Sequence, residues 1–385
     1  MGRTNKTNIA RVDNNLTVSI EKMTDSTPLR IKRIEVEGLF GLYHHLIDLN
    51  LEDRVTILHG PNGVGKTVML QIIEFIFKPY ISYIERDAVL FPFKYFYIEF
   101  TNGHSISKRA ASYFIETSQG SNLTKKEILK LTVHFIREQR LFRCVDTNMI
   151  SKLAEYARDL QIRVKDMLAI YAQKSQDLDR TLPQRLLNKT TSQILGSEQL
   201  KQQLLELESK HRELREIGLL KETATPAFDV EQLNNIDEAK RGMMTLYIED
   251  TQQKLSVLND FAQRIKLFLN IINHKFKHKQ IKIDHEKGFM IEGRYQQELS
   301  LDSLSSGEQH EIVLTYDLLF KVVPNSLVLI DEPELSLHLT WQGHFLPDLL
   351  EIVKIANFDV IIATHSPFII GSRRDLMVAL EDKVQ

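Results

Sequence analysis

The chain has 385 residues and a mass of 44.7 kDa, which allows one large domain with an insertion or two to three smaller ones at about 150 residues per domain. Its 43 % of hydrophobic and 26 % of charged residues are ordinary for a globular protein and exclude global disorder. The 49 basic and 51 acidic side chains give a net charge of −2, which excludes a polycationic nucleic-acid coat but leaves room for a local basic patch.

The first part of the chain predicts strands, a glycine-rich loop and a helix. Residues 1–28 are polar, and we interpret them as a mobile or loosely docked N-terminal arm. Three short apolar runs then predict strands, and a densely apolar stretch predicts a buried helix, at residues 31–39, 46–49, 55–58 and 68–76. Two more strands are predicted at residues 94–100 and 131–136.

The middle of the chain predicts helices. From Met149 to about Phe276 the sequence is rich in Leu, Gln, Glu, Lys and Arg, with a break at residues 225–228 and a second helical stretch through residues 236–272. Two antiparallel helices of about 28 residues would project about 40 Å at 1.5 Å per residue. The pattern fits such an arm and an ordinary helical subdomain equally well.

Strands return in the last third of the chain. A strand pair, a loop followed by a helix, and two single strands are predicted at residues 281–291, 304–320, 326–330 and 359–363. An α/β core that is split by a helical excursion explains this order. We therefore expect two lobes of one domain at 29–148 and 281–385, separated by a helical insertion at 149–280.

Residues 60–67 read GPNGVGKT and fit the G-x-x-x-x-G-K-[ST] pattern of a phosphate-binding loop. In such a loop the backbone N–H groups and the positive end of the next helix bind phosphate oxygens. Lys66 is predicted to reach the β- and γ-phosphates, and Thr67 to ligate Mg²⁺ through its hydroxyl. The predicted nucleotide-binding residues here are Gly60, Pro61, Asn62, Gly63, Val64, Gly65, Lys66, Thr67 and Val68.

The apolar strand at residues 326–330 ends in two carboxylates, Asp331 and Glu332. A buried parallel strand would carry both to the carboxyl edge of the sheet, beside the phosphate loop. There Asp331 is predicted to hold the Mg²⁺ shell, and Glu332 to act as general base on water that attacks the γ-phosphate.

Small residues open the apolar helix predicted after residue 304. This segment, Ser305, Ser306, Gly307 and Glu308, would form a second anion-binding helix end. Because one triphosphate has no need of two such ends from one chain, we expect a second protomer to use it. The alternative interpretation is a simple N-cap box.

Two further side chains follow predicted strands. His365 comes just after the strand at 359–363, within reach of a γ-phosphate, and Gln139 follows the strand at 131–136 and could contact Mg²⁺ or the attacking water. Alone, a histidine in this position is more often a structural hydrogen-bonding residue. The predicted catalytic set is therefore Glu332, His365 and Gln139, and the predicted metal ligands are Thr67, Gln139 and Asp331.

In their order along the chain, these five segments resemble the ABC-type ATPases, and more narrowly the branch with RecF, Rad50, SMC and OLD-family proteins. Residues 333–338, PELSLH, and 364–367, THSP, are similar to this branch rather than to transporters. The resemblance covers residues 31–140 and 281–370, and matches the middle only as a helical insertion. It implies an ABC-type P-loop ATPase head, with a mixed sheet flanked by helices and a short coiled-coil insertion.

The resemblance further implies a head-to-tail homodimer, or a higher homo-oligomer, that holds two ATP molecules with Mg²⁺ between the heads. Lys66 and Thr67 of one protomer would face Ser306 and Gly307 of the other. ATP binding would close the pair, and hydrolysis by Glu332 would release it.

The resemblance also implies a specific biological role for the ATPase. The insertion is far too short for a full SMC or Rad50 arm, and no nuclease centre is visible, since the Asp177/Asp179 pair lies in the helical middle. The chain resembles the PtuA-type ATPase of Septu anti-phage systems, which also occurs in retron operons. This implies an HNH-type nuclease effector as partner, with DNA or a reverse transcriptase–msDNA assembly as further candidates.

The alternative is a RecF-like DNA-binding repair or recombination ATPase, and a transporter motor ranks third. A DNA-binding face would use the basic cluster formed by His274, Lys275, Lys277, His278, Lys279 and Lys282. A solvated helix end is the simpler account of this cluster.

Cysteine content and apolar segments indicate the cellular compartment. The single cysteine, Cys144, permits no internal disulfide and favours a reducing compartment. No run approaches the ~20 apolar residues of a membrane span, and the first thirty residues lack an apolar signal segment. We therefore expect a cytoplasmic protein with no membrane partner.

Overall fold

The computed structural model describes residues 28–77, 93–109, 131–137, 151–188, 194–221 and 236–380, together with the backbone of the short strands β6 (Glu116–Thr117), β8 (Phe142–Val145) and β9 (Asn148–Ser151). The predicted N-terminal arm at 1–28, apart from Pro28, and the predicted helix break at 225–228 lie outside these residues.

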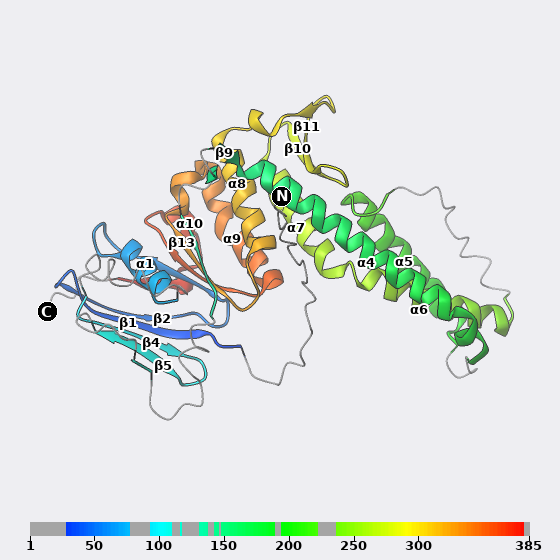
Figure 1. Cartoon of the computed structure of the whole chain (residues 1–385), viewed down its shortest axis with the longest axis horizontal. Coiled ribbons are helices and arrows are strands. Elements are labelled where there is room, and N and C mark those ends of the chain that lie inside the picture. The colour runs from blue at the N-terminus through cyan, green and yellow to red at the C-terminus, as the bar shows by residue number, and fades with distance from the viewer. Residues whose placement is uncertain are drawn as a thin grey trace, which may run out of the picture.

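Two five-stranded sheets form the head (Figure 1). One is antiparallel, in the order β2-β1-β4-β5-β6, with β1 (Ile31–Leu39), β2 (Tyr43–Asp48), β4 (Tyr95–Phe100) and β5 (Ser105–Arg109). The other is parallel, in the order β15-β3-β14-β13-β7, with β3 (Val55–His59), β7 (Val133–Ile136), β13 (Leu327–Asp331), β14 (Asp359–Ala363) and β15 (Met377–Ala379). The strands predicted from the apolar runs are thus confirmed.

The parallel sheet is buried on both faces, which explains why its strands read as continuous apolar runs. Along β13, Leu327 and Leu329 face one core, and Val328 and Ile330 face the other. The first core contains α1 (Lys66–Phe77) and the antiparallel sheet, so α1 lies between the two sheets. The second core includes the helices α7 (Asn259–Lys275), α8 (Ser306–Tyr316) and α9 (Leu339–Ala356) on the other side of the sheet.

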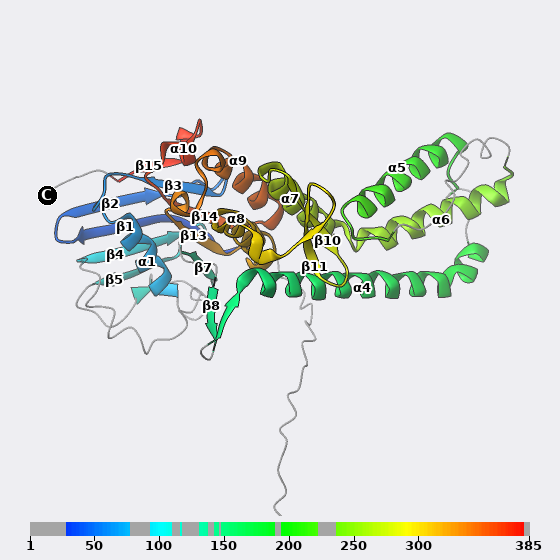
Figure 2. The same ribbon diagram turned by 90° about the horizontal axis from the view of Figure 1, so that it is seen from above.

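The helical middle forms an arm that projects from the head (Figures 1 and 2). It consists of the long helix α4 (Lys152–Asn188), which packs along α6 (Glu238–Ser256), and of α5 (Ser197–Glu216), which packs on α6. At 37 residues, α4 alone is about 55 Å long, and part of this length lies at the root of the arm, where α4 packs on α8. The projection of about 40 Å stays a prediction. Within the described ranges, none of the helices combines the length and the apolarity that crossing a membrane requires.

The returning helical stretch at 236–272 is divided into two helices. The first, α6, ends at Ser256, and the second, α7, begins at Asn259. No glycine or proline marks this break, and it lets Leu255 and Leu258 both be buried. As a result α6 belongs to the arm, whereas α7 packs on α8 and α9 of the head.

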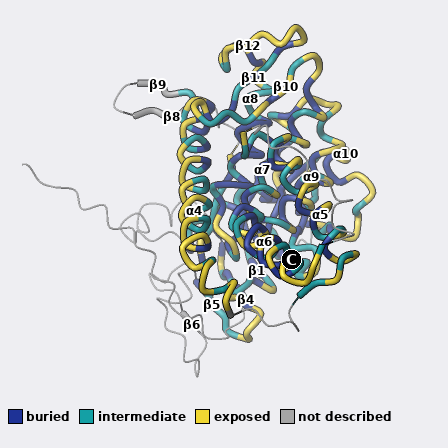
Figure 3. Tube along the Cα trace, turned by 90° about the vertical axis from the view of Figure 1, so that its right-hand side faces the viewer, coloured by how far each residue is buried: buried dark blue, intermediate teal, exposed yellow. Residues whose placement is uncertain are grey.

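A small sheet covers the root of the arm, with strands β10 (Lys279–Asp284), β11 (Gly288–Gly293) and β12 (Glu298–Leu299). Its β10–β11 turn packs tightly against α4. A Cβ on Gly288 would lie 1.8 Å from the carbonyl oxygen of Ala157, so only glycine fits this contact. Figure 3 shows that the outer side of α4 is largely exposed, in contrast to the buried helices of the head.

Candidate nucleotide-binding and hydrolysis site

The phosphate-binding loop leaves β3 at the carboxyl edge of the parallel sheet and enters α1. Gly63 and Gly65 have φ angles of +83° and +97°, which residues with a Cβ rarely adopt. A Cβ on Gly65 would also lie 2.5 Å from Cδ2 of Leu39. The loop therefore has the backbone form in which its N–H groups and the N-terminus of α1 can bind an anion.

The helix after the loop is joined directly to the end of β13. The Thr67 hydroxyl donates a hydrogen bond to Oδ1 of Asp331 at 3.0 Å, although the two residues lie 264 positions apart. Hydroxyl and carboxylate oxygens are the ligands that Mg²⁺ prefers. These two side chains therefore fit the ion that the sequence motif implies.

Three polar side chains form a row at the same edge of the sheet. Lys66 Nζ donates to the carbonyl oxygens of Gly60 and Pro61 at 2.9 and 3.0 Å and lies 3.3 Å from Nδ1 of His365. Nε2 of His365 lies 3.6 Å from Oε1 of Glu332. Burial lowers the pKa of Lys66, and the Glu332 carboxylate opposes that shift. The ammonium group of Lys66, the imidazole of His365 and the carboxylate of Glu332 thus lie in a row beside the loop.

The backbone at Glu332 turns sharply after the strand. Its φ angle is +42°, in the left-handed region, and its N–H donates to the carbonyl oxygen of Ala363 at 2.8 Å. Such a conformation costs a non-glycine residue on the order of 1–3 kcal/mol, and residues that retain it cluster at functional sites. The turn leads the chain into the short helix η6 (Pro333–Ser336).

The Ser-Ser-Gly-Glu segment begins α8 and is closed by a capping box. Glu308 Oε2 accepts from the Ser305 N–H at 2.8 Å, and the Ser305 hydroxyl accepts from the Glu308 N–H at 3.3 Å. Lys279 Nζ contacts the same carboxylate oxygen at 2.9 Å. Burial alone would raise the pKa of Glu308, but Lys279 and Ser305 outweigh it, so the pKa lies below its usual value. A capping box therefore forms at this helix end, with Ser305 and Ser306 exposed beside it, and a role of this segment at a partner's nucleotide stays a prediction.

The predicted site residues form two groups rather than one. The structure brings the phosphate loop together with Asp331, Glu332 and His365. The segment 305–308 belongs to α8, and α8 packs on the opposite face of the sheet from α1. Gln139 lies outside the described residues; it follows β7, the neighbour of β13, and its role stays a prediction.

Sequence reasoning gave no role to Glu334, which the structure places at the site. Its Oε1 accepts hydrogen bonds from the Thr364 hydroxyl and from the N–H groups of His365 and Ser366. The only available signal was its position two residues after Glu332, in the string DEPE.

The basic cluster near the end of α7 is largely neutralised. Lys275 is 3 % exposed and lies 2.5 Å from Glu311 and 2.6 Å from Asp348. Lys279 pairs with Glu308, and Lys282 pairs with Glu292. Lys277 and His278 remain exposed. Three of the four lysines of the cluster therefore contact carboxylates, which reduces the positive charge available to nucleic-acid phosphates.

Reciprocal tyrosine–aspartate contacts join the arm to α8 and to its π-helical extension η5 (Asp317–Lys321). The Tyr316 hydroxyl donates to Asp159 of α4 at 2.6 Å, and the Tyr156 hydroxyl of α4 donates to Asp317. The two rings stack with centroids 4.6 Å apart. Burial and these carboxylates raise the pKa of both tyrosines. The root of α4 and helix α8 therefore form one packed unit.

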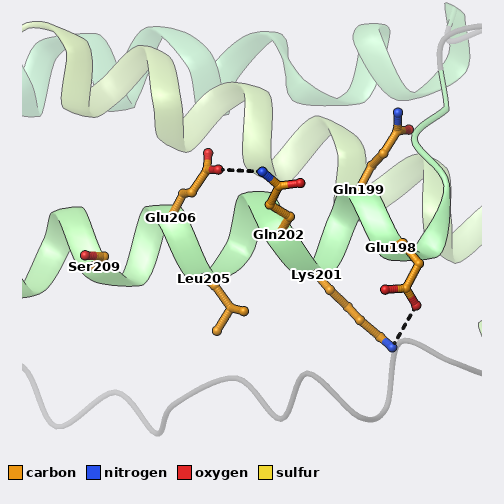
Figure 4. A pocket seen from close by; sticks show the side chains of 7 residues that line it. All are labelled: Glu198, Gln199, Lys201, Gln202, Leu205, Glu206 and Ser209. Carbon is orange, nitrogen blue, oxygen red and sulfur yellow. Dashed lines mark hydrogen bonds and ion pairs between the residues drawn. The ribbon is translucent and has the colours of Figure 1, made fainter.

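A shallow hollow on the arm lies on one helix only (Figure 4). Its lining residues all come from α5, and it contains the pairs Lys201–Glu198 at 3.2 Å and Gln202–Glu206 at 3.0 Å. These side chains satisfy one another, and none belongs to the predicted catalytic set.

The family model described as AAA ATPase domain matches residues 30–370, which is most of the chain. The chain belongs to this ATPase family. The match spans both the phosphate loop and the carboxylates after β13, and it agrees with the ABC-type P-loop fold expected from the motifs.

Individual relatives are more distant. The DNA replication and repair protein RecF of Chlorobium luteolum is 32 % identical over 99 residues, which is 25 % of this chain and 26 % of that protein. The chain thus matches about a quarter of the length of this curated relative. Among solved structures, the Pyrococcus furiosus Smc head domain bound to the C-terminal domain of ScpA is 15 % identical, with 92 % and 95 % of the chains covered and a TM-score of 0.47. The SMC head domain from Thermotoga maritima is 14 % identical, with 91 % and 94 % covered and a TM-score of 0.44.

Proposed function

We propose that this ATPase binds and hydrolyses ATP with Mg²⁺ in a head-to-tail homodimer. The observation that carries the proposal is the Thr67–Asp331 hydrogen bond, beside the row formed by Lys66, His365 and Glu332. It supports a site in which a cation and a triphosphate would meet a carboxylate base at one sheet edge.

Each residue then has a defined task. The loop 60–68 binds the phosphates through backbone N–H groups and Lys66. Thr67 and Asp331 hold Mg²⁺, together with Gln139, and the bound ion supplies charge neutralisation of the phosphates. Glu332 takes the proton of the attacking water, and His365 orients the groups around it.

The placement of residues 305–308 supports a site that is built from two copies of the chain. Residues 305–308 begin α8, which packs on the opposite face of the parallel sheet from α1, the helix that follows the phosphate loop. A second copy, turned head to tail, would bring its Ser306 and Gly307 to that loop.

Mixing two inactive variants tests this arrangement. Lys66→Ala removes the lysine of the phosphate loop, and Ser306→Arg places a large side chain in the segment 305–308. Each variant alone should therefore lose ATP turnover. In an equal mixture, half of the dimers are mixed and each holds one intact site, so turnover should return to about a quarter of the wild-type value. ATP hydrolysis at micromolar protein measures it. A mixture as inactive as its components, or turnover independent of dilution in the wild type, would overturn the head-to-tail assignment.

We further propose that the ATP state regulates a separate HNH-type nuclease effector, as in Septu-type anti-phage systems. The proposal rests on the PtuA-like sequence resemblance and on the arm, whose tip lies far from the site and offers a place for a partner. A change in nucleotide occupancy would shift the head dimer between two states and release the effector. DNA or a reverse transcriptase–msDNA assembly remain further candidate partners.

Co-purification tests the effector proposal. We expect the tagged chain, expressed with its untagged neighbouring genes, to retain a nuclease subunit in a fixed ratio, measured by mass spectrometry of the purified complex. The Lys66→Ala variant serves as a control for dependence on ATP. A homodimer that purifies without any such partner would count against this role. The RecF-like alternative gains no support from the structure, because Lys275, Lys279 and Lys282 are already paired with carboxylates.

A further inference from the structure

The loop after β14 determines where His365 lies. His365 is partly exposed between Lys66 and Glu332, at 3.3 and 3.6 Å, and its ring makes no other hydrogen bond or ion pair in the described part of the chain. Its placement therefore depends on the backbone of residues 364–366.

This backbone is held by one carboxylate oxygen. Oε1 of Glu334 accepts from the Thr364 hydroxyl at 2.7 Å, from the His365 N–H at 2.9 Å and from the Ser366 N–H at 3.1 Å. We propose that Glu334 is a positioning residue that fixes His365 between Lys66 and Glu332. This inference rests on the proposed ATPase function.

The contact is part of a closed network. The Ser366 hydroxyl donates to Oε1 of Gln342 at 2.9 Å, and Gln342 Nε2 donates to the carbonyl oxygen of Glu334 at 3.3 Å. Glu334 follows β13, His365 follows β14, and Gln342 lies on α9, so the network ties together the ends of two strands and a helix. Thr364 is fully buried, which shields these bonds from water and strengthens them.

The second carboxylate oxygen of Glu334 differs from the first in its hydrogen bonding. Oε2 is buried and has no hydrogen-bond partner among the described residues. A glutamine can therefore replace Glu334, with its carbonyl oxygen in the place of Oε1 and its amide in the place of Oε2. Its neutral oxygen is a weaker acceptor than a carboxylate, but the three bonds stay geometrically possible.

Three variants test the role of Glu334. Glu334→Ala removes the acceptor, Glu334→Gln keeps it, and Ser336→Ala is a control in the same turn, where only a bond from Ser336 to the Pro333 carbonyl is lost. A displacement of about 1 Å at a reacting site can cost about 100-fold in rate. We expect kcat to fall about 10- to 100-fold in Glu334→Ala and less than about threefold in Glu334→Gln, with the KM for ATP nearly unchanged in both.

A measurement without ATP separates positioning from activity. The side-chain NMR signal of His365, identified by its loss in His365→Gln, should shift and broaden in Glu334→Ala but not in Glu334→Gln or Ser336→Ala. The double variant Glu334→Ala/His365→Ala should be no slower than His365→Ala alone, because Glu334 acts through His365.

The outcomes separate the two claims. An unchanged His365 signal in Glu334→Ala, or additive losses in the double variant, would overturn the positioning role. If the wild-type protein hydrolyses no ATP while the signal moves as expected, the proposed function fails and the positioning role stands. If Glu334→Gln and Glu334→Ala lowered the unfolding temperature by the same amount and kcat by the same factor, Glu334 would have only a structural role. This result would overturn the proposal.

Discussion

Glu332→Gln is expected to lower the rate of ATP hydrolysis by about 100- to 10,000-fold, the usual contribution of a general base. The amide keeps the size of the side chain and its position beside His365, so ATP binding should change little. Since hydrolysis is the step that would release the closed pair, this variant should accumulate an ATP-dependent dimer. Single-turnover hydrolysis and light scattering after gel filtration, with and without Mg²⁺-ATP, measure the two effects.

A matched control uses an exposed glutamate on α9. Glu351→Gln makes the same chemical change away from the site and should leave both turnover and assembly unchanged. Unchanged turnover in Glu332→Gln would remove Glu332 from the role of base, and a monomer in the presence of ATP would argue against closure by nucleotide.

Lys275→Met is expected to destabilise the protein by about 3–5 kcal/mol, because it leaves buried carboxylates without their cation. Lys275 and Glu311 are 3 % and 4 % exposed, and Lys275 lies 2.5 Å from Glu311 and 2.6 Å from Asp348. Burial alone would lower the pKa of Lys275, but the two carboxylates raise it above the usual lysine value. The contribution is therefore complete below the pKa of an unfolded lysine, about 10.4, and is lost only as the pH rises through the raised value.

Denaturant unfolding at neutral pH measures the loss. Lys277→Met changes an exposed lysine two residues away and should stay within about 0.5 kcal/mol of the wild type. A Lys275→Met/Glu311→Met double variant should regain much of the stability, since apolar side chains can replace a buried ion pair. A loss in Lys275→Met no larger than in Lys277→Met would contradict this account.

Local sequence patterns were sufficient for the phosphate loop and the strand ends. The spacing of glycines before Lys66 and the apolar run before Asp331 each require only a short segment, and parallel strands necessarily place their carboxyl ends along one edge. The contact between Thr67 and Asp331 follows from these two facts together.

Local sequence patterns could not predict the contacts between segments that lie far apart in the chain. Lys275 and Lys279 form a basic run in the sequence, but their partners Glu311 and Glu308 lie 36 and 29 residues away. Charge composition alone therefore suggested a cationic surface where the structure has buried and capped ion pairs. Likewise, the break between α6 and α7 depends on the packing of Leu255 and Leu258, and no glycine or proline signals it.

The paired tyrosine–aspartate contacts at the root of α4 have a thermodynamic consequence. Tyr156 and Tyr316 each donate a hydrogen bond to the other's helix or its extension, so α4 cannot tilt at its base without disturbing the helix that carries Ser306. A ligand at the distal end of the arm that favours one tilt would then alter the affinity for nucleotide. By reciprocity, nucleotide would change the affinity for that ligand by the same factor. The coupling free energy between the two ends of the arm would thus depend on the strength of these tyrosine–aspartate contacts.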